Sequence, residues 1–381
     1  MPELIGHICL ESASGRLPWH GLSASGPAVV ADPALALKTL DELGRLTQSQ
    51  RYVGYLSYEL GRSFERLPVP PASGDVDMHL PAFAFIPVGS APPQDATAEN
   101  ATPSSQLLHP TVDQTGYERA VRRCLDYISA GDVFQINLSQ RLAVRTTLSP
   151  RQVFEQLRRF PAEYGALLDF GRFALVSNSP ELFLRVTTLS DGRRRIVNRP
   201  IKGTRPNAPG MKNELLHSAK DQAELAMIVD LQRNDLGRIC EIGSVVVTEP
   251  RTIETHPTVL HGVATVEGIL RQGVSLTDIL RATFPCGSIT GCPKIRAMQI
   301  IDELEGVRRH AYCGAIGWIG GGELELSVAI RTMTMFDGVA YVPVGGGIVA
   351  DSDPAAEYEE TLTKAAAMLA ALGVTPHTAD S

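Results

Sequence analysis

The sequence has none of the features that mark a membrane-spanning or disulfide-rich chain. No apolar stretch approaches the ~18 consecutive residues that a transmembrane helix requires. The segment Met1 to His7 contains no basic region followed by a long apolar run, so we expect no signal peptide. The six cysteines include no C-x-x-C pair, which favours reduced thiols. We therefore expect a protein of the cytoplasm with no membrane partner.

Clusters of basic residues are also missing. The net charge is −7 at pH 7, and Lys and Arg never form a block. Because binding to phosphates needs clustered basic side chains, we expect no nucleic acid partner. The hydrophobic fraction of 44% and the charged fraction of 20% are normal for a chain that buries a core.

The 381 residues are enough for one large or two ordinary domains. We predict an N-terminal region at 1–88, a polar linker or surface loop at 89–112, a catalytic domain at 113–373 and a tail at 374–381. Strands and helices mix without strict βαβ alternation. This pattern favours an α+β fold with antiparallel sheets.

Near the C-terminus, a glycine turn precedes a helix that carries several charged residues. Gly345-Gly346-Gly347 stands before Asp353, which can cap a helix. Glu357, Glu360 and Lys364 would share one face of that helix. Beside a turn that allows close approach of a ligand, they could form a metal and anion site. A solvated face with a Glu–Lys pair would show the same spacing.

A second predicted helix runs from about Ala219 to Asp235. Asp221 and Glu224 share a face with Ile228 and Leu231, so their carboxylates could reach inward and bind Mg²⁺. Acidic residues that stabilise a helix N-terminus are the alternative interpretation.

Small residues fill the segment Pro285–Lys294, which opens a helix reaching about Leu304. Such a segment suits anion binding by backbone N–H groups at a helix N-terminus. No second glycine stands directly before the lysine, so the spacing is not that of a Walker A loop. A simple tight turn is equally consistent with this pattern.

A lysine in an apolar setting marks a further candidate site. Lys202 lies between Ile201 and Gly203, downstream of Ser179-Pro180-Glu181. Desolvation lowers the pKa of a lysine, which is how a lysine becomes a nucleophile near neutral pH. An ordinary turn lysine is the alternative.

Together these segments resemble the chorismate-utilising enzymes, the anthranilate synthase component I family, over roughly residues 115 to 370. The matching blocks stand in the family's order: Ser179–Glu181, Pro200–Thr204, Met227–Asp235, Gly287–Lys294 and Glu357–Thr361. The resemblance implies two antiparallel β-sheets packed as a sandwich with helices on the outside. Leu10-Glu11-Ser12 resembles the segment that binds tryptophan in anthranilate synthases.

Two positions point to one branch of this family. Anthranilate synthases carry Ala where this chain has Lys202, and a lysine there resembles aminodeoxychorismate synthase component I, in which it attacks the substrate ring. Members that add water carry a basic Lys at the position of Gln135. A glutamine cannot activate water in that way, so the resemblance implies ammonia as the incoming group.

The resemblance also implies a mechanism. Mg²⁺, held by Glu224 and Glu360 with Glu357 nearby through water and Asp221 as a further candidate, would bind the ring carboxylate of chorismate. Lys202 would attack C2 while Glu181 protonates the leaving C4 hydroxyl. Ammonia would then attack C4 and expel the lysine. The product, 4-amino-4-deoxychorismate, would pass to a separate lyase.

Further positions match residues that contact the substrate in this family. His261 matches an active-site histidine, with a satisfied core histidine as the alternative. Residues expected to hold the substrate are Gln135, Thr204, Thr290, Tyr312, Arg331, Gly346, Gly347 and Lys364. Three positions depart from the family pattern. Leu225 stands where a polar residue is common, and Cys286 and Cys292 replace smaller residues, which we interpret as packing.

The nitrogen source is expected to lie outside the chain. Glutamine amidotransferases use a cysteine in a G-x-C-x-G turn, and none of the six cysteines has that context. We therefore expect a separate glutamine amidotransferase subunit or free ammonia. Anthranilate synthase component I and a non-catalytic chorismate- or tryptophan-binding regulator are the competing interpretations. The intact set of Glu181, Glu224 and Glu360 disfavours the regulator.

Overall fold

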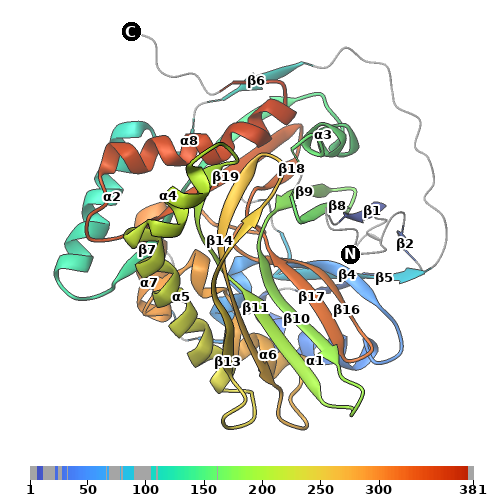
Figure 1. Ribbon diagram of the computed structural model, residues 1–381. Coiled ribbons are helices and arrows are strands. Elements are labelled where there is room, and N and C mark those ends of the chain that lie inside the picture. Colours follow the sequence, from blue (N-terminus) through green and yellow to red (C-terminus); the bar gives the residue numbers. More distant parts are fainter. Residues whose placement is uncertain are drawn as a thin grey trace.

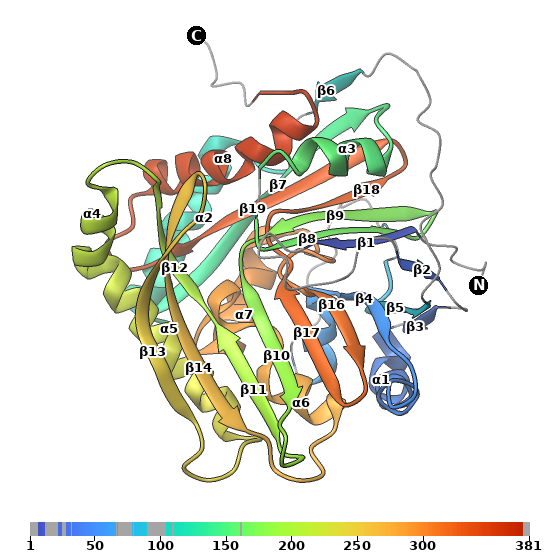
Figure 2. The same ribbon diagram turned by 45° about the vertical axis from the view of Figure 1, so that its right-hand side comes forward.

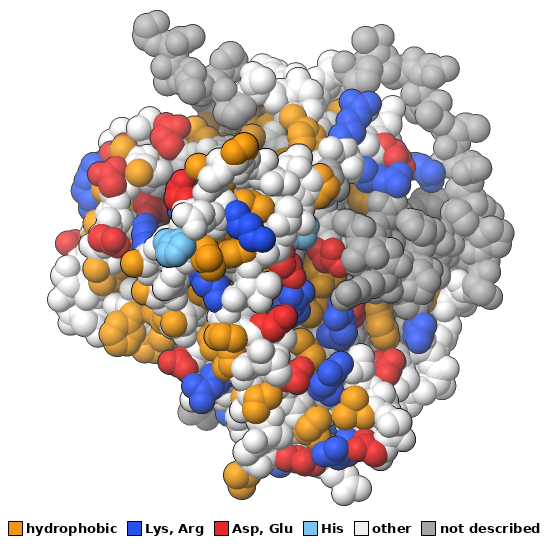
Figure 3. Space-filling model, viewed as in Figure 1, with side chains coloured by type: hydrophobic (Ala, Val, Ile, Leu, Met, Phe, Trp, Pro, Cys, Tyr) orange, Lys and Arg blue, Asp and Glu red, His pale blue; other side chains and the backbone are white. Residues whose placement is uncertain are grey.

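The computed structural model confirms the α+β prediction, with two antiparallel sheets and helices on the outside (Figures 1 and 2). The structure describes residues 7–11, 22–24, 28–31, 33–65, 67, 78, 80–89, 104–108, 110–160 and 162–375. Within these residues, none of the helices has both the length and the apolarity needed to cross a membrane. On the face drawn in Figure 3, acidic and basic side chains of the described residues are intermixed.

The first sheet is built around a long pair of neighbouring strands, β7 and β19. In hydrogen-bonded order its main strands are β7 (Gln135–Thr146), β19 (Val339–Ile348), β18 (Thr332–Phe336), β9 (Phe173–Ser179), β8 (Tyr164–Asp169), β1 (His7–Glu11) and β2 (Leu22–Ala24). The short strands β6 (Ser105–Leu107) and β15 (Gly291–Cys292) also pair with β7. Every pair is antiparallel. The register brings Gly347 opposite Asn137 and Ile348 opposite Ile136.

The second sheet joins the N-terminal region to the rest of the chain. Its strands are β13 (Val246–Thr255), β14 (Val259–Ile269), β11 (Arg194–Arg199), β12 (Ile201–Pro206), β10 (Leu182–Thr188), β17 (Glu323–Val328), β16 (Ala315–Gly320), β4 (Tyr52–Leu56), β5 (Phe83–Gly89) and β3 (Val29–Ala31). β11 and β12 pair with the same strand, β14, on either side of Pro200. β12 therefore continues along β14 beyond the end of β11, with Asn198 opposite Val266 and Ile201 opposite Val263 (Figure 2).

The helices cover the outer faces of both sheets (Figure 1). They are α1 (Ala36–Leu46), α2 (Gln114–Ser129), α3 (Pro150–Leu157), α4 (Met211–His217), α5 (Ala219–Gly237), α6 (Leu276–Thr283), α7 (Lys294–Glu305) and α8 (Pro354–Ala371), with the 3₁₀ turns η1 (Pro33–Leu35), η2 (Tyr58–Ser63) and η3 (Gly287–Ile289). α8 packs on β19 and α2, whereas α5 packs on β12, β13 and β14. These contacts bring one face of α5 and one face of α8 to the region between the sheets.

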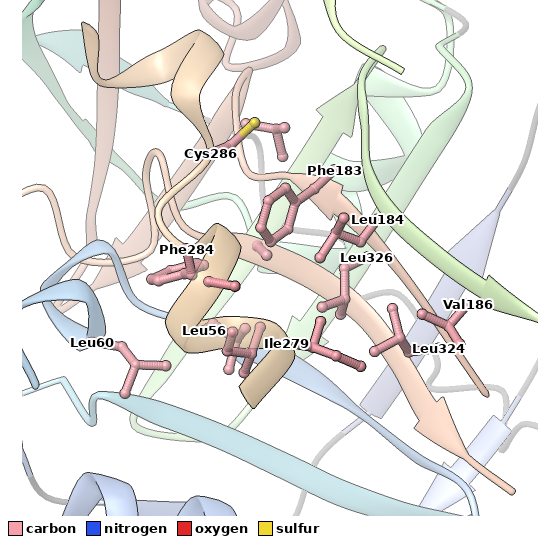
Figure 4. Close-up of a cluster of buried hydrophobic side chains, with 14 of the residues drawn as sticks. Leu56, Leu60, Phe183, Leu184, Val186, Ile279, Phe284, Cys286, Leu324 and Leu326 are labelled. Carbon is pink, nitrogen blue, oxygen red and sulfur yellow. The ribbon is translucent and has the colours of Figure 1, made fainter. Parts of the chain in front are cut away.

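The largest hydrophobic core joins parts of the chain that are far apart in sequence. Leu56 and Leu60 pack in one cluster with Phe284 and Leu326 (Figure 4). In the same region, β4 lies beside β16, with Leu56 opposite Ala315. The N-terminal strands therefore share a sheet and a core with the predicted catalytic domain. Strand β6 also lies within the predicted linker, and the domain boundaries themselves stay a prediction.

Candidate active site

Predicted site residues from both sheets meet at Gly347 on β19. A Cβ atom at this position would lie 3.0 Å from Gln135 Nε2 and 3.2 Å from Lys202 Nζ. Gln135 begins β7 and Lys202 lies on β12, so the two sheets approach each other here (Figure 2). Any side chain at residue 347 would occupy the space of these two polar groups, which explains why glycine is needed.

The predicted face of α8 is present beside Gly346. A Cβ atom there would lie 3.1 Å from Glu357 Oε2, 3.6 Å from Glu360 Oε1 and 3.8 Å from Lys364 Nζ. The helix begins as predicted, because Asp353 accepts a hydrogen bond from the Ala356 amide at 2.9 Å. The sequence pattern thus places three charged groups over a strand that leaves them room.

The two carboxylates of α8 lie in different electrostatic surroundings. Glu357 is buried, and burial raises its pKa, although Ser352 donates a hydrogen bond of 2.6 Å to its Oε1. Desolvation opposes ionisation of Glu360, but Lys364, at 2.6 Å, together with Lys202 and Lys220, outweighs it and lowers the pKa of Glu360. Lys364 also donates to the Gly345 carbonyl at 2.9 Å. Two carboxylates followed by one lysine therefore occupy this face of α8.

The face of α5 that carries Asp221 and Glu224 is turned toward β12. Glu224 Oε2 lies 3.6 Å from Lys202 Nζ, and the two side chains are only 15% and 13% exposed. Asp221, in contrast, pairs with Arg205 at 3.1 Å. Metal binding by Asp221 remains a prediction, and its pairing with Arg205 disfavours it. Leu225, the departure from the family pattern, is buried in the hydrophobic core.

The donor chemistry of this region fits Mg²⁺. Carboxylate oxygens are the ligands that Mg²⁺ prefers, and it often takes only one or two of them with water and substrate oxygens. Glu357 and Glu360 meet at Gly346, while Glu224 faces Lys202, whose charge also acts on Glu360. Among the described residues no set of three acidic, His or Cys side chains forms a ready-made metal cluster. Glu224 is paired with Lys202 and Glu360 with Lys364, so a cation bound by either carboxylate would compete with a lysine.

Glu181, which follows β9, has the properties of a proton donor. It is 4% exposed, and Ser288 Oγ donates a hydrogen bond of 2.6 Å to its Oε1. Burial raises the pKa of Glu181 to about 7, with Ser288, Lys202 and the Ile201 amide acting in the opposite direction. A carboxyl with a pKa near neutrality can hold a proton and release it at physiological pH.

His261 is held in a neutral state by its surroundings. The side chain is 2% exposed and its Nδ1 lies 2.9 Å from Thr204 Oγ1, which comes from the neighbouring strand. Burial, with a further contribution from Arg331, lowers the pKa of His261 to about 3. The imidazole is therefore uncharged at neutral pH. It can orient Thr204 or a ligand but cannot serve as a cation.

Arg331 is a largely buried cation that has no counterion among the described residues. Its side chain makes no hydrogen bond or ion pair with any other described residue, and burial lowers its pKa. Its φ of 49° is unusual for a residue other than glycine. An arginine remains charged in proteins, so this geometry leaves a desolvated cation available to an anionic ligand.

The two remaining predicted contacts lie near η3. Thr290 is fully buried at the end of η3, and its hydroxyl donates to the Cys286 carbonyl at 3.1 Å. Tyr312 is 4% exposed, and burial raises the pKa of its hydroxyl well above 10. Arg309 stabilises the predicted segment around η3 by donating a hydrogen bond of 2.9 Å to the Ile289 carbonyl.

The sequence pattern did not reveal three neighbours of the site. Ser288 lies inside the Pro285–Lys294 segment, but its bond to Glu181 depends on how residues 107 positions apart in the sequence meet. Ser352 was visible only as part of the turn before α8. Lys220, whose charge acts on both Glu357 and Glu360, precedes Asp221 on α5. No local spacing signals a contact between two helices so far apart in sequence.

Comparison with known proteins identifies the family to which this chain belongs. A family model described as chorismate binding enzyme matches residues 22–370. The chain belongs to the chorismate binding enzyme family. Its relatives carry two different names within this family. Anthranilate synthase component 1 of Thermus thermophilus is 40% identical over 359 residues, covering 84% of this chain and 77% of the relative. Aminodeoxychorismate synthase component 1 of Escherichia coli is 39% identical over 345 residues, covering 82% and 74%.

Solved structures of family members have the same fold. The crystal structure of anthranilate synthase component I from Streptococcus pneumoniae aligns with a TM-score of 0.76 and 28% identity. The alignment covers 97% of this chain and 90% of that one. The predicted resemblance to the anthranilate synthase component I fold is therefore confirmed.

Proposed function

We propose that this chorismate binding enzyme is an aminodeoxychorismate synthase component I, which converts chorismate and ammonia to 4-amino-4-deoxychorismate. The observation that carries the proposal is the position of Lys202. Its amine lies over Gly347, beside Gln135, where it can reach a ligand bound between the sheets. Anthranilate synthases resemble this chain elsewhere but carry alanine at this position. A lysine at the centre of the site provides a nucleophile that an alanine cannot.

The charged residues have complementary parts in the proposed reaction. Lys202 attacks C2 of the ring, and Glu181 supplies a proton to the C4 hydroxyl as it leaves. Lys202 also acts electrostatically on Glu181, so nucleophile and acid belong to one site. Ammonia then forms the bond to C4, and the lysine leaves C2 with the electrons of its carbon–nitrogen bond.

Substrate binding relies on cations and on small residues. Arg331, without a counterion among described residues, suits bidentate binding of a substrate carboxylate. Thr204, Thr290 and Tyr312 supply hydroxyl groups, while Gly346 and Gly347 allow the ring to approach the backbone of β19. Glu224, Glu357 and Glu360 would hold Mg²⁺, which, when bound, polarises the ring carboxylate and neutralises acidic charge.

Two partners complete the proposed pathway of para-aminobenzoate and folate synthesis. Ammonia comes from glutamine through a separate amidotransferase subunit, because this chain has no G-x-C-x-G turn. The pyruvyl group stays on the product in this reaction. A separate lyase must therefore remove it.

Anthranilate synthase component I is the second candidate. The Thermus thermophilus relative of that name is as similar to this chain as the Escherichia coli aminodeoxychorismate synthase, at 40% and 39% identity. Overall similarity therefore does not separate the two reactions, and Lys202 is the feature that favours the first.

Product analysis tests the proposal directly. The purified chain is incubated with chorismate, Mg²⁺ and ammonium, and the product is identified by mass and ultraviolet spectrum. We expect an amino-substituted chorismate that retains pyruvate and yields para-aminobenzoate when a lyase is added. Formation of anthranilate instead would establish the second candidate.

A further inference from the structure

A chain of three hydrogen bonds runs from helix α5 to Glu181. Gln232 Nε2 donates to Cys286 Sγ at 3.4 Å, and Cys286 Sγ lies 3.2 Å from Ser288 Oγ. Ser288 Oγ in turn donates to Glu181 Oε1 at 2.6 Å. Glu181, Gln232, Cys286 and Ser288 are all at most 5% exposed, so water does not compete for these bonds. The contacts form one continuous path into the site.

When Glu181 is ionised, the number of available protons fixes the direction of the bonds that link it to Ser288 and Cys286. An ionised carboxylate only accepts, so the single proton of Ser288 is committed to Glu181. Ser288 then has no proton left for the sulfur, and the Cys286 thiol must donate to Ser288 Oγ. Gln232 can donate a hydrogen bond to the sulfur of Cys286 because its amide nitrogen is a donor. Each member thereby orients the next one toward Glu181.

We propose that Cys286 is a positioning residue, which acts through Ser288 to orient and stabilise the ionised form of Glu181. The inference rests on the proposed role of Glu181 as general acid. It assigns a purpose to a residue that the sequence pattern indicated only as packing. Cys292, the other cysteine that replaces a smaller residue, makes no side-chain hydrogen bond to any described residue and supplies the matched control.

The surroundings of Cys286 keep its thiol protonated and fixed. Figure 4 shows its sulfur at the edge of the hydrophobic cluster, near Phe183. Burial, with a contribution from Glu181, raises the pKa of Cys286 to about 11. The thiol therefore keeps the hydrogen that it must donate across the neutral pH range. Its apolar neighbours leave the polar side of the sulfur facing Ser288 and Gln232.

Three groups on two elements act on the ionised form of Glu181. Ser288 approaches from η3, Lys202 from β12 and the Ile201 backbone amide from the start of β12. Each favours the carboxylate, and together they oppose the effect of burial. Cys286 affects only the first of these groups. Its replacement should therefore change the pKa of Glu181 while Lys202 and Ile201 remain in place.

The test is a titration of Glu181 in the ligand-free protein. Infrared difference spectra follow the carbonyl stretch of the protonated carboxyl group across neutral pH, and Glu181→Gln identifies the band. Ser288→Ala should raise the pKa of Glu181 by about one pH unit, because a hydrogen bond to a charged group is lost. Cys286→Ala should raise it by a smaller amount, about 0.5 unit, because a thiol is a weak donor.

Two further variants separate hydrogen bonding from packing. Cys286→Ser keeps a donor and should leave the pKa of Glu181 close to that of the parent protein, whereas Cys292→Ala should not change it. An unchanged pKa in Cys286→Ala, or an equal rise in Cys286→Ser, would overturn the inference. Thermal unfolding of each variant confirms that it is folded at the temperature of the titration.

The titration needs no substrate, so its outcome does not depend on the proposed reaction. If the chain does not convert chorismate but the pKa shifts occur, the proposed function fails and the positioning role stands. If the chain is active, the pH profile of kcat/KM should contain an apparent pKa due to Glu181, and this pKa should be higher in Cys286→Ala. A uniform loss of activity without such movement would show that Cys286 serves packing alone.

Discussion

Lys202 on β12 and Glu224 on α5 form a largely buried ion pair, with Nζ 3.6 Å from Oε2. The pair joins the proposed nucleophile to a proposed metal ligand. A cation bound by Glu224 competes with the Lys202 amine for the same carboxylate. If Glu224 holds Mg²⁺ as proposed, the ion pair with Lys202 would be weakened, which links the two proposed roles.

The first prediction concerns the metal. Glu360→Gln removes one of the two carboxylates that meet at Gly346, so turnover at ordinary Mg²⁺ should fall by at least about 100-fold while the fold is retained. Initial rates across a range of Mg²⁺ concentrations, with circular dichroism for the fold, measure this effect. The exposed neighbour Glu359 supplies the control, because Glu359→Gln changes the same charge one residue away. Parental activity in Glu360→Gln, with Mg²⁺ still required, would remove Glu360 from the site.

The second prediction concerns the source of nitrogen. The chain alone should use ammonium but not glutamine, because none of its cysteines lies in a G-x-C-x-G turn. Assays with each nitrogen donor and homogeneous protein distinguish the two. Addition of a glutamine amidotransferase subunit should then restore glutamine-dependent turnover. Use of glutamine by the isolated chain would show that it contains an amidotransferase site of its own.

Local sequence signals predicted the helical parts of the site well. Asp353 and Pro354 marked the start of α8, and the spacing of Glu357, Glu360 and Lys364 placed them on one face. These features depend on residues within two turns of a helix. A sequence pattern contains such information because helix geometry is regular.

Contacts between segments far apart in the sequence were harder to predict from the sequence. The bond between Ser288 and Glu181 and the meeting of Gln135 with Lys202 over Gly347 depend on how the two sheets pack. The same limit explains Asp221, whose spacing suggested a metal ligand although Arg205 engages its carboxylate. The resemblance to a family named most of these residues, but only packing determines their partners. Ser12 and the side chains of Leu10 and Glu11, predicted to resemble a tryptophan-binding segment, lie outside what the structure describes.

The third prediction links Glu181 to the pH dependence of stability. Its pKa is about 7 in the folded protein against an ordinary value of 4.5, so the folded state holds this proton more tightly. The associated stability is fully present below about pH 4.5 and is lost as the pH rises through about 7. The loss amounts to roughly 3 kcal/mol.

Glutamine at residue 181 stays neutral and avoids this loss. As the pH rises from 5 to 8, the parent protein should lose up to about 3 kcal/mol of unfolding free energy that Glu181→Gln does not lose. Urea denaturation at both pH values gives the difference, with Glu359→Gln as the exposed control. Parallel pH dependence in Glu181→Gln and the parent would show that Glu181 titrates normally in the folded state.

The last prediction concerns Lys202, which distinguishes the two candidate reactions. With chorismate and Mg²⁺ but no ammonia, a covalent adduct should accumulate at Lys202, because the step that expels the lysine lacks its nucleophile. Peptide mass mapping after quenching locates the adduct, which should be absent in Lys202→Ala. This variant should form 4-amino-4-deoxychorismate at least about 100-fold more slowly.

Removal of the lysine also opens C2 to other nucleophiles. Ammonia could then attack C2 directly, so Lys202→Ala should shift the products toward the 2-amino isomer. Lys364→Ala serves as the comparison, since it removes a nearby ammonium group but leaves the nucleophile in place. Product analysis by mass and ultraviolet spectrum separates the isomers. If Lys202→Ala makes the 4-amino product at a near-parental rate, the covalent mechanism is wrong. The main reason to prefer aminodeoxychorismate synthase over anthranilate synthase would then be lost with it.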